Sequence, residues 1–231
     1  MATSSRRLFL FDIDGTLITS GGAGESALKA AVADRFGKTE DLSDITIAGA
    51  TDSAISRRLL EKHGIEQTPE NISALLDAYL GHLGDRLPKH SGCVLPGIVQ
   101  LLDALRERPD KCMLALLTGN LAKGAELKLT HYGVWDYFEF GAFADDSHDR
   151  NKLGSFAQTR ARERSGEEFS PDQIYVIGDT PRDVECGKAF GAKTVAIATG
   201  NYSGPELSAH EPDFLFEDLS DTEKVLAALF G

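Results

Sequence analysis

Five short apolar runs, separated by stretches with helical spacing, constrain the fold of this chain more than any other feature. Each run is continuous rather than alternating, which is typical of a strand buried on both faces of a parallel sheet. The intervening patterns predict helices on both faces of that sheet. The predicted strands are residues 8–11, 113–117, 138–143, 174–177 and 194–198, with 214–216 as a candidate edge strand.

The predicted helices of this region fall between those strands. Pro181 lies near a helix start, and Gly133 and Gly191 come just after helix ends, where each residue type is favoured. The sequence therefore predicts an α/β fold, a Rossmann-like doubly wound parallel sheet. Its helices are expected at residues 98–106, 121–132, 153–164, 184–190 and 222–230.

The stretch between the first two predicted strands has a different character. It carries helical patterns at residues 25–36, 53–63 and 69–87 with no convincing buried strand, and Thr51 or Asp52 could cap the second helix. Glycines near residue 22 and between 91 and 97 supply flexible joints. We expect a helical cap domain at 18–95, inserted after the first strand into a catalytic core of 1–17 and 96–231. The alternative is an all-α N-terminal half packed rigidly on the sheet.

The composition excludes several partners. A net charge of −12 disfavours nucleic acid and anionic membranes, because both require a basic face. Acids interrupt the first apolar run too early for a signal peptide or a membrane span. Cys93, Cys112 and Cys186 are scattered without CxxC spacing, which indicates a reduced, cytoplasmic protein without disulfides.

Polar residues end three of the buried strands. Asp12, Thr118 and Asp179 each follow an apolar run, and the carboxyl ends of parallel strands meet at one edge of a sheet, where ligands bind. Asp14 shares a side of the chain with Asp12. Buried carboxylates are costly unless a cation or hydrogen bonds replace their water. The alternative for this segment alone is an Asp-Gly hairpin turn.

Four aspartates would form an acidic cluster whose ligand atoms are all oxygen. Asp12, Asp14, Asp179 and Asp183 suit Mg²⁺, and no histidine or cysteine stands beside them to suggest zinc. For Asp179 and Asp183 the alternative is a helix N-terminus that favours acids through its dipole.

The motif Asp12-x-Asp14-Gly15-Thr16 resembles the first motif of the haloacid dehalogenase superfamily in its phosphatase form. Thr118, a basic segment at 150–152 and the run 178–183 follow in the superfamily's order, and the resemblance covers nearly the whole chain. It extends to the subgroup of phosphoglycolate phosphatases and β-phosphoglucomutases, which carry a helical cap.

The resemblance implies a role for each motif. Asp12 would be the nucleophile that forms an aspartyl phosphate, and Asp14 the general acid and base. Asp12, Asp179, Asp183 and the backbone carbonyl of Asp14 would bind Mg²⁺. The groups expected to bind substrate phosphate are Gly15, Thr16, Thr118, Gly119 and Asn120, the last three opening a helix. A plain N-cap role is the alternative for Thr118.

The third motif departs from the superfamily's pattern. Most members place a lysine before a proline, whereas this chain has Asp149-Arg150-Asn151-Lys152. If Phe156 begins the buried face of the next helix, Arg150 falls at the lysine position and Lys152 on the first helical turn. Arg150 is therefore preferred as the phosphate-neutralising cation, with Lys152 as the alternative and a solvated surface cation as the non-catalytic reading of either.

The predicted cap offers candidates for substrate recognition. Its Gly49-Ala50-Thr51-Asp52 resembles the substrate-facing loop of the phosphoglycolate phosphatase subgroup. Arg57 and Arg58 lie one turn onward, where they would meet a second anionic group of the substrate or simply be solvated. Thr51, Asp52 and Arg57 are accordingly predicted to bind substrate.

These observations together predict an Mg²⁺-dependent phosphatase acting on a small phosphorylated metabolite, phosphoglycolate-like or a sugar phosphate. A phosphomutase of the β-phosphoglucomutase kind is the alternative, and a non-catalytic phosphate-binding module is a further one. Dehalogenation is disfavoured because a second acid at position 14 and a metal cluster serve phosphoryl chemistry. We expect a small-molecule substrate, no nucleic acid or membrane partner, and a monomer or homodimer.

Overall fold

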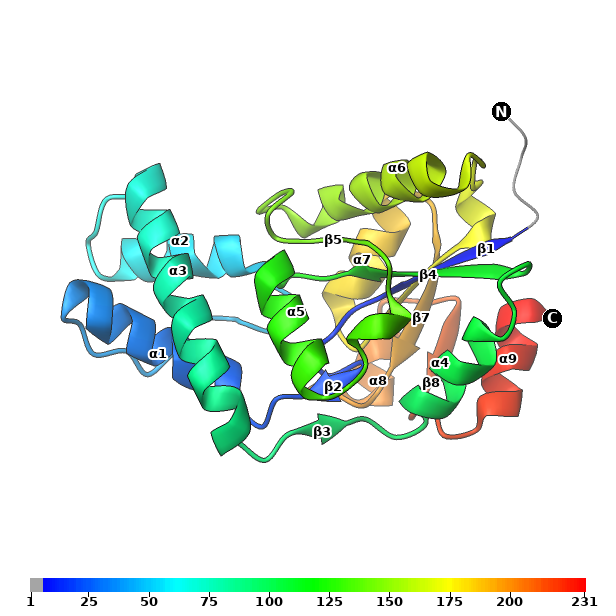
Figure 1. The fold of residues 1–231 in the computed structure, drawn as a ribbon, viewed down its shortest axis with the longest axis horizontal. Helices are drawn as coiled ribbons and strands as arrows, with labels where there is room; N and C mark the ends of the chain where they lie inside the picture. The colour runs from blue at the N-terminus through cyan, green and yellow to red at the C-terminus, as the bar shows by residue number, and fades with distance from the viewer. Residues whose placement is uncertain (1–5) are drawn as a thin grey trace.

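A computed structural model describes residues 6–231 and has a parallel sheet at its centre with helices on both faces (Figure 1). The six strands lie in the order β5-β4-β1-β6-β7-β8, and every neighbouring pair is parallel. The predicted α/β fold class is confirmed. The strands are β1 (Arg7–Phe11), β4 (Cys112–Leu117), β5 (Gly141–Ala142), β6 (Ile174–Gly178), β7 (Lys193–Ile197) and β8 (Phe214–Phe216).

One predicted strand is much shorter than expected. The apolar run 138–143 contributes only Gly141–Ala142 to the sheet, because β5 is an edge strand paired with β4 over two residues. Trp135–Tyr137 forms a 3₁₀ turn just before it, and Phe138 turns into the core as a loop residue. The run is apolar because it covers the core, not because it continues a strand.

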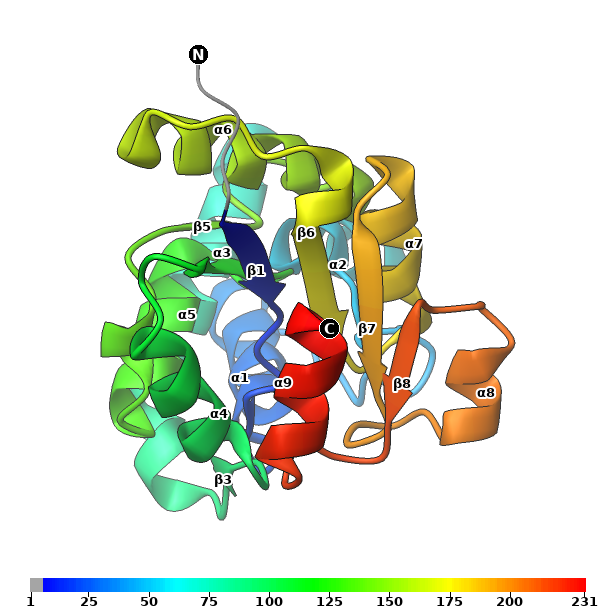
Figure 2. The same ribbon diagram turned by 90° about the vertical axis from the view of Figure 1, so that its right-hand side faces the viewer.

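The two faces of the sheet are covered by different helices. In β1, Phe9 and Phe11 pack with residues of α4, α5 and α9, whereas Leu8 and Leu10 pack with residues of α6 and α7. Figure 2 shows the two sets of helices on opposite sides of the strands. The helices are α4 (Ile98–Arg106), α5 (Ala122–His131), α6 (Leu153–Ser165), α7 (Pro181–Ala189), α8 (Gly204–Ser208) and α9 (Thr222–Phe230).

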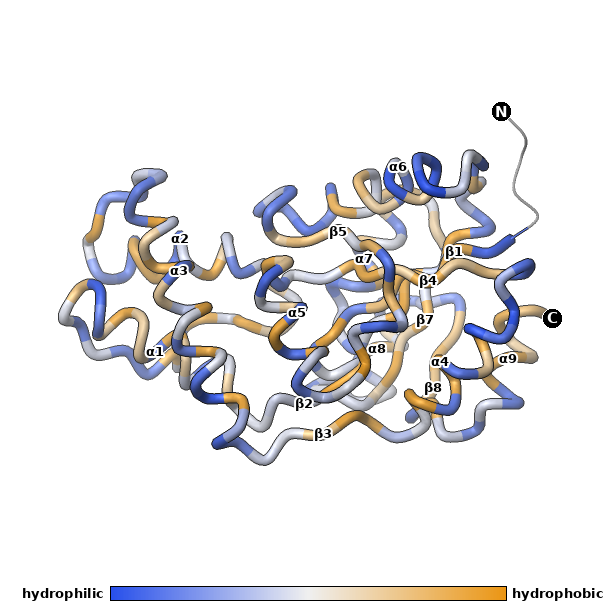
Figure 3. Tube along the Cα trace, in the orientation of Figure 1, coloured by the Kyte–Doolittle hydropathy of each residue, from blue (hydrophilic) through white to orange (hydrophobic). Residues whose placement is uncertain are grey.

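Burial of the strands on both sides explains their continuous hydrophobicity. Residues 8–11 of β1 are all fully buried. Each such side chain contributes about 1.5–3 kcal/mol relative to exposure to water. The apolar colouring along β1 and β4 in Figure 3 gives way to polar colouring in the surface loops. The polar residues that follow these strands are therefore exceptions to their surroundings.

Three helices between β1 and α4 form a separate apolar cluster. They are α1 (Ala23–Phe36), α2 (Asp52–Lys62) and α3 (Pro69–Arg86), followed by the 3₁₀ turn η1 (Leu87–Lys89). Leu28, Leu59, Leu75 and Leu83 are buried within this cluster. Figure 1 shows α1, α2 and α3 gathered at one end of the molecule. The domain division at residues 17/18 and 95/96 stays a prediction, and residues 1–5 lie outside the described residues.

The two connections to these helices pair with each other. β2 (Ile18–Thr19) and β3 (Cys93–Val94) form a two-stranded antiparallel ladder beside the sheet. This pairing was not predicted, because two residues per strand are too short to show a period. It holds the entry and exit of the three-helix segment side by side.

The register of α6 differs from the sequence prediction. Phe156 is 38% exposed, and the buried face is made by Leu153, Ala157 and Ala161 instead. The assumption that Phe156 begins this face is therefore wrong. Apart from Leu153, the face of α6 that packs on the sheet carries only small residues, and the ring of Phe156 lies outside that face.

Two further predictions concern single residues. Thr51 is the N-cap of α2, where its hydroxyl accepts a hydrogen bond from the Ala54 N–H at 3.1 Å. The three cysteines are unpaired. Within residues 6–231, no helix has the length and apolar character needed to cross a membrane.

Candidate active site

Asp12 lies at the carboxyl end of β1, in the middle of the sheet. Its N–H donates a hydrogen bond to the Ile177 carbonyl of β6 at 2.9 Å, and its side chain is buried. The next residue, Ile13, is fully buried in the core, and the Asp14 carboxylate beyond it lines a cavity. The alternation of the chain thus directs both acids away from the core.

Asp12, Asp179 and Asp183 bring their carboxylates together at the ends of β1 and β6. One oxygen of each lies within 4.8 Å of the others, and all three residues are buried. The Thr16 hydroxyl donates to Asp179 Oδ1 at 3.1 Å. Asp183 Oδ2 accepts hydrogen bonds from the Thr180 N–H at 3.0 Å and from its hydroxyl at 2.7 Å.

Two glycines make room for the Asp179 carboxylate. A Cβ on Gly15 would lie 2.3 Å from Asp179 Oδ2, and one on Gly200 would lie 1.7 Å from the same atom. Gly15 also has a φ of +84°, which favours glycine. The close approach of backbone at both positions fixes where this carboxylate lies.

Arg150 is the cation that the structure places with these acids. It begins the 3₁₀ turn η3 (Arg150–Lys152), is 7% exposed, and forms a charged hydrogen bond to Asp183. Its Nη2 lies 3.2 Å from Asp12 Oδ1, and its Nη1 donates to the Gly49 carbonyl at 3.2 Å. Lys152 is exposed. Of the two candidate cations, Arg150 therefore lies beside the acids and Lys152 does not, although the helix register assumed for Arg150 was wrong; its role in neutralising phosphate stays a prediction.

The acids carry more negative charge than Arg150 neutralises. Burial raises the pKa of Asp179 to about 8, helped by Asp183 and Asp12, and burial raises the pKa of Asp12 to about 6 against the lowering effect of Arg150. Asp12 Oδ1 is buried and receives no properly oriented hydrogen bond from the described residues. An orphaned oxygen among three carboxylates fits a hard divalent cation.

The loop after β4 approaches the same acids. The buried Thr118 hydroxyl accepts hydrogen bonds from the N–H and the Nδ2 of Asn120, at 3.3 and 2.9 Å. Asn120 Nδ2 also donates to Asp14 Oδ2 at 2.9 Å. A Cβ on Gly119 would lie 2.1 Å from the Ala50 carbonyl oxygen, so this glycine permits the loop to touch the segment before α2.

A buried lysine completes this network. Lys128 of α5 donates from Nζ to Asp14 Oδ2 at 2.5 Å and to Asn120 Oδ1 at 2.7 Å, and its side chain is 5% exposed. Reasoning from the sequence missed this residue. The available signal was its position on the buried stripe of α5 that includes Gly124, Ala125 and Leu129, where a charged residue is unusual.

The predicted cap residues occupy different places. The Asp52 N–H donates to the Gly119 carbonyl at 2.7 Å, and Asp52 Oδ2 accepts from the Leu121 N–H at 2.8 Å. The Thr51 hydroxyl donates to the His148 carbonyl at 2.8 Å. Arg57 lines a separate groove beside Leu121, and Arg58 is exposed. Of this set, only Asp52 is among the residues that line the cavity next to Asp12.

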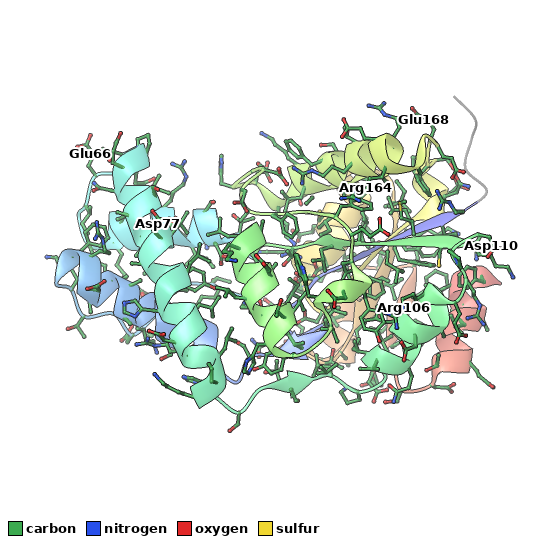
Figure 4. All side chains as sticks on the ribbon, in the orientation of Figure 1. Glu66, Asp77, Arg106, Asp110, Arg164 and Glu168 are labelled. Carbon is green, nitrogen blue, oxygen red and sulfur yellow. The ribbon has the colours of Figure 1, made fainter. Side chains whose placement is uncertain are left out.

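The cavity lies between the sheet edge and the three-helix segment. Its volume is about 380 Å³, within the range of sites that enclose small molecules. Charged groups labelled on the surface in Figure 4, such as Glu66 and Arg164, are exposed and lie away from it. Its lining includes Asp12, Asp14, Gly15, Leu28, Asp52, Ile55, Tyr79, Gly119, Asn120, Lys128, Arg150, Asp179 and Thr180.

Two known proteins match this chain, one over nearly its full length and the other over about half of it. The phosphoglycolate phosphatase of Vibrio vulnificus is 28% identical over 228 residues, which cover 95% of this chain and 96% of that protein. The pyrophosphatase PpaX of Bacillus velezensis is 39% identical over 124 residues, covering 54% of this chain and 55% of that protein.

Solved structures share the fold. A hydrolase from Pseudomonas syringae superposes with a TM-score of 0.74 at 24% identity, covering 98% of this chain and all of that one. CbbY from Rhodobacter sphaeroides, solved with phosphate, has a TM-score of 0.75 at 18% identity, covering 94% of this chain and 96% of that one.

The family comparison bears on the activity class. Residues 9–197 match the haloacid dehalogenase-like hydrolases, a span that includes the end of β1, all of β4, β6 and β7, and every acid of the cluster. The prediction of an enzyme of the phosphatase type is confirmed by this match together with the full-length relatives named as phosphatases. This chain belongs to the haloacid dehalogenase-like hydrolase family.

Proposed function

We propose that this hydrolase is an Mg²⁺-dependent phosphatase that cleaves a small phosphorylated metabolite, phosphoglycolate-like or a sugar phosphate, through an aspartyl phosphate on Asp12. The observation that carries the proposal is the convergence of Asp12, Asp179, Asp183 and Arg150 beside a cavity of small-molecule size. The names of the full-length relatives support the phosphoglycolate-like option.

Asp12 and Asp14 would carry the two halves of the reaction. Asp12 attacks phosphorus to form the acyl phosphate while Asp14 donates a proton to the leaving oxygen. Asp14 then takes a proton from the water that attacks the acyl phosphate. Its carboxylate is 41% exposed to the cavity and is held by Asn120 and Lys128, so it is both accessible and oriented.

The transferring phosphoryl group would be held by donors from two strand ends. Arg150 neutralises charge from one side, and the hydroxyl of Thr118 with the N–H groups of Gly119 and Asn120 meets the phosphate oxygens from the other. Gly15 and Thr16 would contribute backbone N–H groups. Lys152 is the alternative cation, although its side chain is exposed to solvent.

Asp12, Asp179, Asp183 and the backbone carbonyl of Asp14 are the groups we propose for Mg²⁺. When bound, the ion supplies charge neutralisation to the phosphoryl group and to the carboxylates. Positioning and electrostatics dominate phosphoryl transfer, so the rigid placement of these oxygens is the part that the protein contributes.

Magnesium should stabilise the protein more at high pH than at low pH. The pKa values of Asp12 and Asp179 are raised to about 6 and about 8 from the ordinary 3.8. The folded state therefore binds more protons than the unfolded state through this window, and stability without metal falls as pH rises through it. Protons and Mg²⁺ compete for these oxygens. Thermal unfolding with EDTA and with Mg²⁺, at about pH 5.5 and pH 8, measures the difference.

Asp179→Asn should lose most of the Mg²⁺-induced shift, and Asp183→Asn should lose less if its contact runs through water. EDTA should also abolish phosphate release from p-nitrophenyl phosphate, with recovery on adding Mg²⁺. Asp110→Asn, on the surface position labelled in Figure 4, is the matched control and should behave as wild type. An equal shift at both pH values, or full activity in EDTA, would remove the metal assignment.

We also propose that residues 18–95 act as a cap domain that closes over the cavity and excludes water. Support comes from the separate apolar cluster of α1, α2 and α3 and from the paired connections β2 and β3. Hydrogen exchange should show these helices opening as one unit, independently of the sheet. Uniform exchange across both parts would contradict this division.

Screening the purified protein against phosphorylated metabolites with Mg²⁺ tests the function as a whole. Release of inorganic phosphate supports a phosphatase, whereas isomerisation of a sugar phosphate without release supports the phosphomutase alternative. A cytoplasmic location and a monomeric or dimeric state stay predictions.

A further inference from the structure

The cavity continues beyond the reacting groups into a region that the proposed chemistry leaves unassigned. There the first turn of α1, the start of α2, the middle of α3 and the middle of α5 meet. Four polar side chains of this region line the cavity: the exposed Glu25 of α1, and the buried Asp52, Tyr79 and Lys128.

Tyr79 is a buried phenol without a hydrogen-bond partner among residues 6–231. It is 2% exposed and packs in the apolar cluster of α1, α2 and α3, yet it lines the cavity. Burial raises its pKa well above the ordinary value, so the hydroxyl keeps its proton as a donor. Buried hydroxyls are normally satisfied, and this one is left for a ligand.

Lys128 lies beside Tyr79. A Cβ added to Gly24 would be 3.9 Å from Lys128 Nζ and 3.9 Å from Tyr79 Oη, so both atoms flank the same point at the start of α1. Two of the three ammonium protons are used by Asp14 and Asn120. The third is available to the cavity.

The charges at this end favour a neutral ligand. Lys128 and Arg150 are the cations among the described residues that line the cavity, and Arg150 is engaged with Asp12 and Asp183. Lys128 faces Asp14 in direct contact and Asp52 nearby. A carboxylate brought here would add a negative charge to a region that already carries three acids, Asp14, Glu25 and Asp52, against one cation. The cap arginines offer no relief, because Arg57 lines another groove.

Hydrogen bonding points in the same direction. Tyr79 and Lys128 offer donors, and Asp52 is an acceptor whose carboxylate receives the Leu121 N–H on Oδ2 and keeps lone pairs free for a further donor. An alcohol hydroxyl both donates and accepts, so it satisfies the two kinds of group together, whereas a carboxylate only accepts. A short chain of hydroxyls matches this part of the cavity.

We propose that Asp52, Tyr79 and Lys128 select a neutral, hydroxyl-bearing leaving group, such as a short polyol or sugar, over one that carries a carboxylate. The inference rests on the proposed phosphatase function and chooses within its substrate range. It assigns specificity to residues of α2, α3 and α5 that neither attack phosphorus nor transfer a proton, although Lys128 also holds the Asp14 carboxylate.

Three small esters of similar length test the assignment: 2-hydroxyethyl phosphate, 2-phosphoglycolate and ethyl phosphate. The wild-type kcat/KM should be about tenfold higher for 2-hydroxyethyl phosphate than for 2-phosphoglycolate, as expected for one unfavourable charge contact. Asp52→Asn keeps the acceptor for Leu121 N–H and removes the charge, so it should reduce that preference about tenfold. Tyr79→Phe should reduce the preference for 2-hydroxyethyl over ethyl phosphate about fivefold, the worth of one hydrogen bond.

Tyr132→Phe is the matched control, because its hydroxyl is also buried without a partner among the described residues but is not part of the cavity lining. It should keep both ratios. A wild-type preference for 2-phosphoglycolate overturns the inference without any variant and leaves the phosphatase proposal standing. So do ratios that stay unchanged in both the Asp52 and the Tyr79 variants. Failure to release phosphate from any ester, p-nitrophenyl phosphate included, overturns the proposed function and this inference together.

Discussion

Replacing Asp12 with asparagine should lower kcat by about 10⁴- to 10⁶-fold, the scale of loss when a covalent nucleophile is removed. The amide has nearly the same shape as the carboxylate but does not form an acyl phosphate. The position is buried between strand ends and its N–H is bonded to Ile177, so the backbone should not move. Phosphate release from p-nitrophenyl phosphate with Mg²⁺ is the measurement.

The same variant should not be less stable than wild type in EDTA near neutral pH. Asp12 is one of three buried carboxylates crowded together, and Arg150 still pairs with Asp183 when residue 12 is neutral. Removing the charge of Asp12 relieves its repulsion with the other two carboxylates, as expected for an active site whose function costs the protein stability. Trapping wild type with beryllium fluoride and Mg²⁺ should place the adduct on Asp12. Turnover of the Asp12→Asn variant close to wild type would refute the covalent mechanism.

The sheet was predictable because its strands are buried on both faces. Such strands must be continuously apolar, and β1, β6 and β7 therefore stood out within one residue or two of their true bounds. Helices α4 and α9 were predicted with their observed bounds, because each packs one apolar face on that sheet and its apolar residues therefore recur with the helical period. Short elements carry no period, which is why β2 and β3 were missed.

The candidate site was predictable only where its residues follow strands. Asp12, Thr118 and Asp179 were found because a polar residue directly after a buried run is costly unless it binds a partner. Lys128 lies in α5, eight residues past Asn120, and Tyr79 lies in the middle of α3. The sequence of a helix does not reveal which of its sides meets a cavity. Both become visible only when α3 and α5 are placed against each other.

Arg57 illustrates the converse difficulty. Its distance from Asp52 of five residues along α2 turns it toward a different groove, next to Leu121 and Asp145, although sequence proximity suggested a shared site. A helix rotates about 100° per residue, so residues five apart lie well over a hundred degrees apart around the axis. Proximity along a helix therefore says little about which cavity a side chain lines.

Arg150→Ala should lower kcat/KM by about 10²- to 10³-fold or more, which corresponds to a loss of several kcal/mol in transition-state stabilisation. Lys152→Ala should keep a kcat/KM near that of wild type. Arg150 is buried between Asp12 and Asp183, where charge-assisted contacts are strong. Lys152 is exposed and two residues further along, so its charge is screened by solvent. Steady-state kinetics with one small phosphomonoester compares the two variants directly.

Loss of Arg150 will also affect stability, which must be separated from loss of catalysis. Removing one partner of a buried ion pair typically costs about 3–5 kcal/mol because the remaining charge is uncompensated. Mg²⁺ binding to the same carboxylates should restore part of that loss. Thermal unfolding in Mg²⁺ therefore shows whether the Ala variant is folded under assay conditions.

Arg150→Lys separates charge from geometry. An ammonium keeps the positive charge beside Asp12 and Asp183 but lacks the fork that reaches the Gly49 carbonyl as well. We expect the Lys variant to be more stable than the Ala variant and to recover only part of the activity. In the wild type, the rigid guanidinium of Arg150 bridges the acids, the phosphate site and the segment before α2, and an ammonium does not reach all three. If Lys152→Ala proves the more damaging change, then the loop must rearrange by two residues when substrate binds, and Lys152 takes the neutralising role.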